Sequence, residues 1–333
     1  MPDVVCVGEM LIDFVATVSG TTIEDAPAFE RAPGGAPANV AVGLSRLGLK
    51  VAFMGKVGDD PFGYFLADTL AAAGVDVGSV RFAKEARTGL AFVSLGADGE
   101  RKFTFYRHPS ADMLWTPDEV DADLIRDARL VHFGSISLIG EPSRSATLRA
   151  VELAENAGAL VSYDPNLRPA LWGSPAEAKA GMLLGWPRAN IIKVSEEEAQ
   201  YLTGETDLIR AGRSLWHDRL QLMTITLGHR GCIYLTSRFE GLMDGIAVEP
   251  VDTTGAGDGF FAGLLRGVLM DPGALDDELR LRDICRFANI VAALTTTGRG
   301  AIPALPDLAR LQQKPRQPGI YHQRGRQHGL YRR

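Results

Sequence analysis

Short apolar runs alternate with segments of helical periodicity along most of the chain. Predominantly apolar runs of strand length occupy residues 4–7, 51–57, 130–133, 159–163, 191–194 and 223–227. Outside these runs, apolar residues recur at helical spacing over residues 34–47, 60–73, 141–156, 175–184, 196–202 and 208–216. Buried strands that alternate with helices are typical of a mainly parallel sheet covered on both faces, so the pattern predicts an α/β fold.

Two regions interrupt this alternation. Residues 89–95 and 102–107 both have the pattern of strands, and only the polar turn GADGE lies between them, which predicts a β-hairpin. Residues 10–18 are also extended and apolar, with no covering helix. Together these segments predict a small second sheet that projects from the main one.

Composition narrows the class of protein. The chain has 333 residues, of which 46% are hydrophobic and 23% charged, as in globular proteins. It has no apolar stretch of about 18 to 20 residues that could span a membrane, and its first residues lack the pattern of a secretory signal. The cysteines, Cys6, Cys232 and Cys285, are too far apart for a disulfide framework or a zinc site. These features predict a cytoplasmic protein with no membrane partner.

Charge is distributed unevenly along the chain. Residues 312–333 contain only basic charged residues, whereas the whole chain has a net charge of −6. The rest of the chain is therefore strongly acidic, which argues against nucleic acid as a partner. The basic segment is predicted to be a flexible tail, with contact to an anionic partner as the alternative.

The sharpest chemical motif is DTTGAGDG at residues 252–259. An apolar segment of helical pattern follows, so the small residues Gly255, Ala256 and Gly257 are expected at a helix N-terminus. Free backbone N–H groups and the positive end of the helix dipole can bind a phosphate there. Asp258 lies in the same first turn and is suited to act as a general base. The alternative is a capped helix in which the aspartate is merely favourable.

A second motif, PGGAPAN, spans residues 33–39. Gly34 and Gly35 allow a ligand to approach the backbone closely before a predicted helix. Asn39 on that helix can both donate and accept hydrogen bonds, which complements a sugar hydroxyl. Taken alone, a glycine pair before a helix more often marks a tight turn.

These two motifs, in this order, resemble the paired signatures of the ribokinase-like (PfkB) family of sugar kinases. The first signature resembles PGGAPANVAVGLSRLG and the second DTTGAGDGF. Further similarities are GEMLIDF, YRHPSADMLWTPDE, FGSISLI, SYDPNLRPALW, IIKVSEEEAQYLTG and TLGHRGC. The combination is most similar to the fructokinase branch and extends over about residues 4–303.

The resemblance implies a ribokinase-like three-layer α/β/α sandwich with a mainly parallel central sheet and a small β-sheet lid. The kinase domain would span residues 1–311, with the lid formed by about 10–33 and 88–113. Residues 312–333 would then be a basic C-terminal tail. The resemblance also implies a homodimer formed through the lid, whose faces and open edges would otherwise be exposed.

For catalysis, the resemblance implies that Asp258 deprotonates the sugar hydroxyl. The backbone amides of Gly255, Ala256 and Gly257 would form an anion hole for the γ-phosphate. Arg168 would bridge the substrate and the transferring phosphate, a role that suits the planar guanidinium.

On the sugar side, the resemblance implies contacts from Asp13, Gly34, Gly35 and Asn39. The sequence adds Phe105 and Arg107, which lie two residues apart and so share one face of a strand. That face can cover the sugar, with Arg107 reaching its oxygens. For Phe105 the alternative is simple packing within the hairpin.

On the nucleotide side, the resemblance implies roles for the following residues: Lys193, Ser195, Thr226, Gly228, Gly231, Gly257 and Asn289. The chain departs from the common N-x-x-E pattern, because Ser195 stands in place of asparagine. Glu198 still fits the organisation of water around Mg²⁺, and the alternative for this acidic run is a charged first helical turn.

Two further positions in the second signature carry implications. Asp252 and Thr254 match positions that help form a monovalent-cation site, such as one for K⁺. Gly259 stands where serine is frequent, and we expect it to loosen the helix slightly.

The resulting hypothesis is an ATP-dependent, Mg²⁺-requiring kinase that phosphorylates a ketose, with D-fructose converted to fructose 6-phosphate. One alternative is a kinase for 2-keto-3-deoxygluconate, whose carboxylate would demand more positive charge at the lid than Arg107 alone supplies. A different class, a sugar-binding homologue without activity, is disfavoured by the intact Asp258 and its neighbouring glycines.

Overall fold

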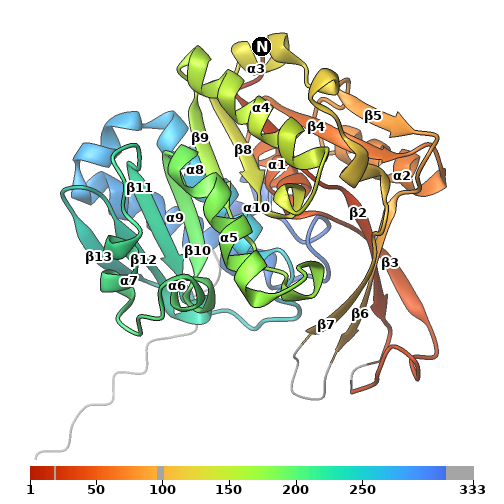
Figure 1. The fold of residues 1–333 in the computed structure, drawn as a ribbon. Coiled ribbons are helices and arrows are strands. Elements are labelled where there is room, and N and C mark those ends of the chain that lie inside the picture. Colours follow the sequence, from red (N-terminus) through yellow and green to blue (C-terminus); the bar gives the residue numbers. More distant parts are fainter. Residues whose placement is uncertain (19, 96–100, 313–333) are drawn as a thin grey trace, which may run out of the picture.

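A computed structural model describes residues 1–18, 20–95 and 101–312 (Figure 1). The predicted GADGE turn and nearly all of the basic tail lie outside these residues. Nine strands form the central sheet, in the order β13-β12-β11-β10-β9-β8-β1-β4-β5. Their bounds are β1 Val4–Val7, β4 Val51–Gly58, β5 Val80–Ala83, β8 Leu130–Gly134, β9 Leu160–Asp164, β10 Ile191–Ser195, β11 Leu222–Thr226, β12 Gly231–Leu235 and β13 Glu240–Asp244.

The strands from β11 to β5 are parallel, and an antiparallel pair, β12 and β13, completes one edge. Successive side chains of a strand point to opposite faces of the sheet. Val4 and Cys6 accordingly belong to one hydrophobic core, and Val5 and Val7 to a second core on the other face.

Helices cover both faces of the sheet, which gives the predicted three-layer α/β/α sandwich (Figure 1). The first core is closed by α1 Ala36–Arg46, α2 Pro61–Ala72, α8 Ala256–Met270, α9 Glu278–Thr295 and the short α10 Leu308–Gln312. The second is closed by α3 Ala122–Arg126, α4 Ser143–Ala157, α5 Pro175–Gly185, α6 Glu196–Thr203 and α7 Leu208–Ser214.

Helix α8, which begins with the second motif, is fixed by close packing against α9. A Cβ atom at Gly263 would lie 2.9 Å from the Cα atom of Ala288, and one at Gly259 would lie 2.7 Å from the Thr295 hydroxyl. Glycine at these positions therefore lets the two helices approach each other closely. A larger side chain at Gly259 would have to displace the Thr295 hydroxyl.

Four strands form a second sheet, which projects from the main body at one end (Figure 1). Its order is β3-β2-β6-β7, with bounds β2 Leu11–Ala16, β3 Phe29–Gly34, β6 Gly89–Leu95 and β7 Arg101–Tyr106. The predicted hairpin is confirmed, because β6 and β7 pair in antiparallel register with Ala91 opposite Phe105. Strand β2 adds to β6 in parallel, which joins the predicted segment 10–18 to the hairpin. This lid sheet is the predicted second sheet.

Several elements carry weak sequence signals and were not predicted. The β12–β13 hairpin, β5 and the long helix α9 are absent from the expected list of strands and helices. The cysteines behave as expected, since Cys6, Cys232 and Cys285 are all buried free thiols. Within the part of the chain that the structure describes, we find no helix long and apolar enough to cross a bilayer.

Candidate active site

A cavity of about 330 Å³ lies where the lid sheet meets the carboxyl ends of the central parallel strands. Ligands of open α/β sheets bind at this edge. The residues that line it come from β2, β7, β10, the loop after β9, and the N-termini of α1 and α8. They are Glu9, Leu11, Asp13, Gly35, Ala36, Asn39, Phe103, Phe105, Ile136, Asn166, Arg168, Lys193, Thr253, Thr254, Gly255, Gly257 and Asp258.

The N-terminus of α8 points its small residues at this cavity. Gly255 is the N-cap and has a left-handed backbone with φ of 76°, which favours glycine. A side chain at Gly257 would meet the Lys193 ammonium, since a Cβ atom there would lie 3.1 Å from Nζ. The helix therefore presents its first N–H groups, and the adjacent cation, to the same space. This arrangement can bind a phosphoryl group.

Asp258 lies in the first turn of α8 and is nearly buried, with 9% of its surface exposed. The amide Nδ2 of Asn39, on α1, donates a hydrogen bond to Asp258 Oδ2 at 2.7 Å. Burial, and then the negative charge of Asp164, raise the pKa of Asp258 to about 6, against the opposing effects of Asn39, Lys193 and Arg168. Asp258 is thus an ionised, oriented and relatively basic carboxylate at neutral pH, as a general base requires.

A buried ion pair lies beside this base. Lys193 Nζ donates to Asp164 Oδ2 at 2.9 Å. Although burial opposes its charge, Asp164 and Glu198 raise the pKa of Lys193 on balance, so the ammonium remains charged. Asp164 was not predicted as a site residue. Its signal was available, because it is the last residue of the apolar run that forms β9.

Glu198 is buried at the start of α6, where it completes a capping box. Its carboxylate accepts hydrogen bonds from the backbone N–H groups of Ser195 at 2.8 Å and Leu167 at 2.6 Å. Ser195 in turn accepts from the Glu198 N–H through its hydroxyl oxygen. Burial raises the pKa of Glu198, with Asp164 adding to the effect.

The carboxylates of Asp164 and Glu198 fit the oxygen chemistry of Mg²⁺, but through water. Both already have protein partners, and no group of three or more His, Cys, Asp or Glu side chains in the described ranges could hold a metal directly. Mg²⁺ commonly keeps several waters and binds to nucleotide phosphates with the help of one or two carboxylates. The donor set is compatible with that mode.

The sugar-side motif is shaped by close approach to the lid. A Cβ atom at Gly35, whose φ is 109°, would lie 2.3 Å from the carbonyl oxygen of Glu9. A Cβ atom at Gly34 would lie 2.5 Å from Asp13 Oδ2. Gly34 does not itself line the cavity, so its place in the site is to leave room for Asp13.

The lid contributes two aromatic rings to the cavity. Phe103 and Phe105 lie on the same face of β7, with stacked rings 5.8 Å apart between centroids. The Arg168 guanidinium lies 5.5 Å from the Phe103 ring, which connects the lid to the loop after β9. Phe103 was not predicted, although it lies two residues from Phe105 and so shares its strand face.

Arg107 is not among the residues that line the cavity. It follows the last residue of β7, is 5% exposed, and donates from Nε to Asp112 Oδ2 at 2.9 Å. Its Nη2 atom pairs with the same carboxylate. The guanidinium that the sequence places over the sugar is thus bound to Asp112, which the sequence pattern gave no reason to connect with it.

Comparison with known proteins identifies the family. The model of the pfkB family carbohydrate kinases matches residues 1–308. The chain belongs to this family. It is 53% identical over 323 residues to probable fructokinase-3 of Arabidopsis thaliana, covering 95% of this chain and 94% of that protein. It is 54% identical to fructokinase-2 of Solanum lycopersicum, covering 91% and 93% of the two chains.

Solved structures agree with this assignment. The fructokinase of Xylella fastidiosa with bound ATP has a TM-score of 0.85 and 34% identity, covering 94% of this chain and 98% of that one. The fructokinase of Vibrio cholerae O395 in its fructose-, ADP- and calcium-bound form has a TM-score of 0.83 and 36% identity, with the same coverage. The three-layer architecture with a second, smaller sheet is therefore the ribokinase-like fold.

In this pfkB kinase, several expected nucleotide residues lie beside the β12–β13 hairpin and do not line the cavity. A Cβ atom at Gly231 would lie 2.0 Å from the Met243 carbonyl oxygen, and Asn289 Nδ2 donates to the carbonyls of Met243 and Asp244. These two residues hold the hairpin in place. Thr226 donates from its hydroxyl to Val194, and Gly228 has a left-handed backbone with φ of 61°.

The loop before α8 is closed by Asp252. Its Oδ1 atom accepts hydrogen bonds from the Thr254 N–H at 2.9 Å and the Thr254 hydroxyl at 2.6 Å. Its Oδ2 atom accepts from the Gly300 N–H at 2.8 Å. The two residues expected at a monovalent-cation site therefore contact each other and fix the approach of the chain to the anion-binding turn.

Proposed function

We propose that this chain is a fructokinase that transfers the γ-phosphate of ATP to D-fructose and produces fructose 6-phosphate. The observation that carries the proposal is the position of Asp258, a buried carboxylate of raised pKa beside a glycine-rich helix N-terminus in the cavity below the lid. The fructokinases among the relatives and solved structures support fructose as the acceptor.

The proposed reaction is direct phosphoryl transfer. A fructose hydroxyl gives its proton to Asp258, and its oxygen forms a bond to the γ-phosphorus while the bond from that phosphorus to the bridging oxygen of ADP breaks. The N–H groups of Gly255, Ala256 and Gly257 would stabilise the negative charge of the transferring group. Lys193, beside this turn, and Arg168, in the loop after β9, would offset charge on the phosphates. Mg²⁺, when bound with the nucleotide and hydrated near Asp164 and Glu198, would supply further charge compensation.

The lid would position the sugar and exclude water. Asp13, Phe103 and Phe105 lie on its inner face and line the cavity. Because Phe103 contacts Arg168, closure of the lid and placement of the catalytic arginine would be coupled. Exclusion of water limits transfer of the phosphate to water in place of the sugar.

The charge of the cavity favours a neutral sugar over 2-keto-3-deoxygluconate. Arg107, the cation that the sequence offered for a carboxylate substrate, is already paired with Asp112. The lid side of the cavity instead presents the carboxylates of Glu9 and Asp13. An anionic sugar would be repelled there, which disfavours this substrate. A sugar-binding role without activity is disfavoured by the intact Asp258 and its neighbouring glycines.

The test is a panel of sugars, which includes D-fructose, D-ribose, D-glucose and 2-keto-3-deoxygluconate, with ATP and Mg²⁺. Product is measured by coupled assay, and the phosphorylated position by NMR. We expect kcat/KM to be greatest for D-fructose, with the phosphate on the 6-hydroxyl. A greater kcat/KM for 2-keto-3-deoxygluconate, or fructose binding without turnover, would contradict the proposal.

The remaining expectations from the sequence belong to the same proposal. We propose a kinase domain over residues 1–311 with a basic tail after it, a cytoplasmic location, and a requirement for K⁺ near Asp252 and Thr254. The family match, which ends at residue 308, and the buried free thiols support this organisation. Activity with K⁺ replaced by Li⁺ tests the cation site, where loss of activity is expected.

We also propose a homodimer formed through the outer face of the lid. Phe14, Phe29, Phe92 and Tyr106 form a continuous set of ring contacts there, with centroid distances of 5.2 to 5.3 Å. Tyr106 remains 64% exposed in the single chain. Sedimentation should show a dimer at micromolar concentration and a monomer for Tyr106→Glu, whereas a monomeric wild type would refute the proposal.

A further inference from the structure

Glu9 is a buried carboxylate in the cavity that neither motif includes. It follows β1, is 1% exposed and lines the cavity together with Asp13, Gly35 and Asn39. Its Oε1 atom accepts a hydrogen bond from the Ala36 N–H at 3.3 Å. Within the described part of the chain, its Oε2 atom is buried and has no hydrogen-bond partner.

An ionised carboxylate in this position destabilises the fold unless a hydrogen-bond donor binds its free oxygen. Removal of a charged group from water without a compensating hydrogen bond costs several kcal/mol. Burial accordingly raises the pKa of Glu9 to about 7, although Arg107 opposes the shift. The Nε and Nη2 atoms of Arg107 donate to Asp112, and among the described residues no donor, Arg107 included, forms a hydrogen bond with Glu9 Oε2.

The cavity contains a second unsatisfied atom of the same kind. Asn39 Nδ2 donates to Asp258, which fixes the amide so that Oδ1 is the remaining atom, and Oδ1 is buried without a partner in the described residues. The ionised Glu9 carboxylate and the Asn39 amide oxygen both accept hydrogen bonds. The hydroxyls of a sugar can donate to both atoms, whereas an ionised carboxylate has no donor to offer them.

We propose that Glu9 binds the substrate, with Oε2 accepting a hydrogen bond from a hydroxyl of the sugar that is not the one phosphorylated. This inference rests on the proposed sugar kinase activity and adds a specificity residue to it. The backbone carbonyl of Glu9 packs against Gly35, so the Glu9 side chain is anchored at the point where the lid joins the body. The same residue would thus connect recognition of the sugar with the N-terminus of α1.

The test is a thermodynamic cycle that combines a substitution of Glu9 with the removal of one hydroxyl from the sugar. Wild type, Glu9→Gln and Glu9→Met are assayed with D-fructose, with its 1-, 3- and 4-deoxy analogues, and with 2,5-anhydro-D-mannitol, which lacks the anomeric hydroxyl. Loss of a hydrogen bond to a charged group should lower kcat/KM for D-fructose by roughly 10- to 100-fold in Glu9→Met, mainly through KM. With one analogue the same variant should lose less than about threefold, because that hydroxyl is already missing.

A matched control separates binding from structure. Asp60→Asn alters another buried carboxylate, which does not line the cavity. Asp60 caps α2 through the Gly63 N–H and accepts a hydrogen bond from the Thr88 N–H. The effect of Asp60→Asn should be the same with every sugar. Glu9→Gln, which preserves the shape of the side chain, repeats the pattern with a smaller loss if Glu9→Met does not fold.

The outcomes distinguish the inference from the proposed function. An equal loss with all analogues for both Glu9 variants, or no loss with any, would overturn the role of Glu9 while fructose turnover by the wild type stands. If the wild type neither phosphorylates nor binds D-fructose by calorimetry, both are wrong. A loss confined to sugars that retain one particular hydroxyl supports the inference and identifies that hydroxyl.

Discussion

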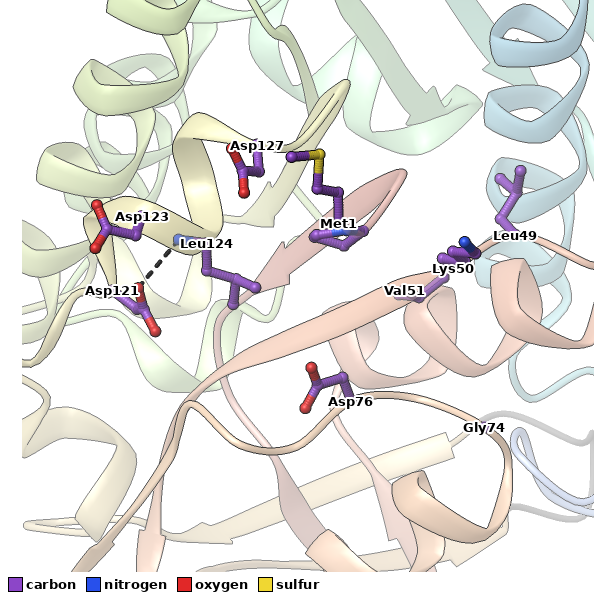
Figure 2. Close-up of a pocket in the computed structure, with 11 residues that line it drawn as sticks. Met1, Leu49, Lys50, Val51, Gly74, Asp76, Asp121, Asp123, Leu124 and Asp127 are labelled. Atoms are coloured by element: carbon purple, nitrogen blue, oxygen red, sulfur yellow. Dashed lines mark hydrogen bonds between the residues drawn. The ribbon is translucent and has the colours of Figure 1, made fainter.

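Two cavities lie at opposite ends of the parallel strands, and they differ in whether their buried polar groups have hydrogen-bond partners. The larger, of about 550 Å³, lies beside the start of β1 and β4 (Figure 2). It is lined by Met1, Pro2, Leu49, Lys50, Val51, Gly74, Asp76, Asp121, Asp123, Leu124 and Asp127. The smaller, of about 330 Å³, lies under the lid and contains Asp258, Lys193 and Glu9.

Local structure explains three of the four carboxylates that line the larger cavity. Asp121 caps α3 by accepting from the Leu124 N–H (Figure 2), and it also accepts from the Ser79 hydroxyl. Asp76 accepts from the Gly78 N–H. Asp123 pairs with Arg126, and its side chain is 86% exposed. In the smaller cavity, by contrast, charged groups are buried together, and the acceptors Glu9 Oε2 and Asn39 Oδ1 have no partner among the residues that the structure describes. The cavity volumes and the buried unpaired acceptors therefore point to different cavities, and the second criterion agrees with the active site that we propose.

The largest expected effect is at Asp258. Asp258→Asn removes the base while Asn39 keeps a partner, so kcat should fall about 10³- to 10⁴-fold with fructose binding nearly unchanged. Since the folded-state pKa of about 6 lies above the unfolded value, the ionised aspartate destabilises the fold above pH 6. The variant should therefore be more stable at pH 8, by about 1 to 3 kcal/mol. Steady-state kinetics and denaturant unfolding measure the two effects, and near-normal kcat would refute the assignment.

The second effect compares two buried lysines. Lys193→Met removes the cation beside Asp164 and Asp258, and kcat/KM should fall about 10²- to 10³-fold. The matched control is Lys56→Met, whose ammonium is also buried and pairs with Glu85 and Glu119 outside the cavity. Both variants should lose stability in thermal unfolding, but only Lys193→Met should lose turnover. An equal loss of kcat/KM in both would mean that Lys193 acts only on the fold.

The third effect is a dependence on pH. Asp258 accepts a proton only when ionised, so kcat/KM should decline as the pH falls below about 6, approaching tenfold per pH unit. The pKa of Glu9, which also lines the cavity, is raised as well. The control is Glu9→Gln, in which kcat/KM should still decline below about pH 6. An activity that is flat from pH 5 to pH 8 in both proteins would contradict a titrating base.

The smallest effect is expected in the larger cavity. The double variant Asp123→Asn and Asp127→Asn removes two of its charges without touching the residues under the lid. We expect kcat/KM for D-fructose to change by less than about twofold, as for most surface substitutions. A tenfold loss in the same coupled assay, with an unchanged melting temperature, would assign this cavity a part in the reaction.

The fold was largely predictable because its signals are local. The apolar runs at β1, β4, β8 and β10, and the polar sequence GADGE between the segments that form β6 and β7, are visible in the order of residues. The β12–β13 hairpin and α9 were not predicted, since they are held together by contacts between distant segments, such as Asn289 on α9, which donates to the carbonyls of Met243 and Asp244 on β13.

The site was predictable only where a motif carries it. Asp258, Asn39 and the α8 N-terminus follow from short patterns, and the structure brings them together. The partners of Arg107 and Lys193 could not be predicted, because Asp112 and Asp164 reach them only through the folded geometry of the lid and of neighbouring strands. Glu9 was missed for the same reason, since only the structure shows an oxygen without a partner.

Hydrogen–deuterium exchange with D-fructose and a non-hydrolysable ATP analogue tests most directly which cavity is the active site. We expect slower exchange in β2, β7 and the first turn of α8, with no change at residues 49–51 and 121–127. Protection confined to those two segments, with none at the lid or α8, would contradict this expectation.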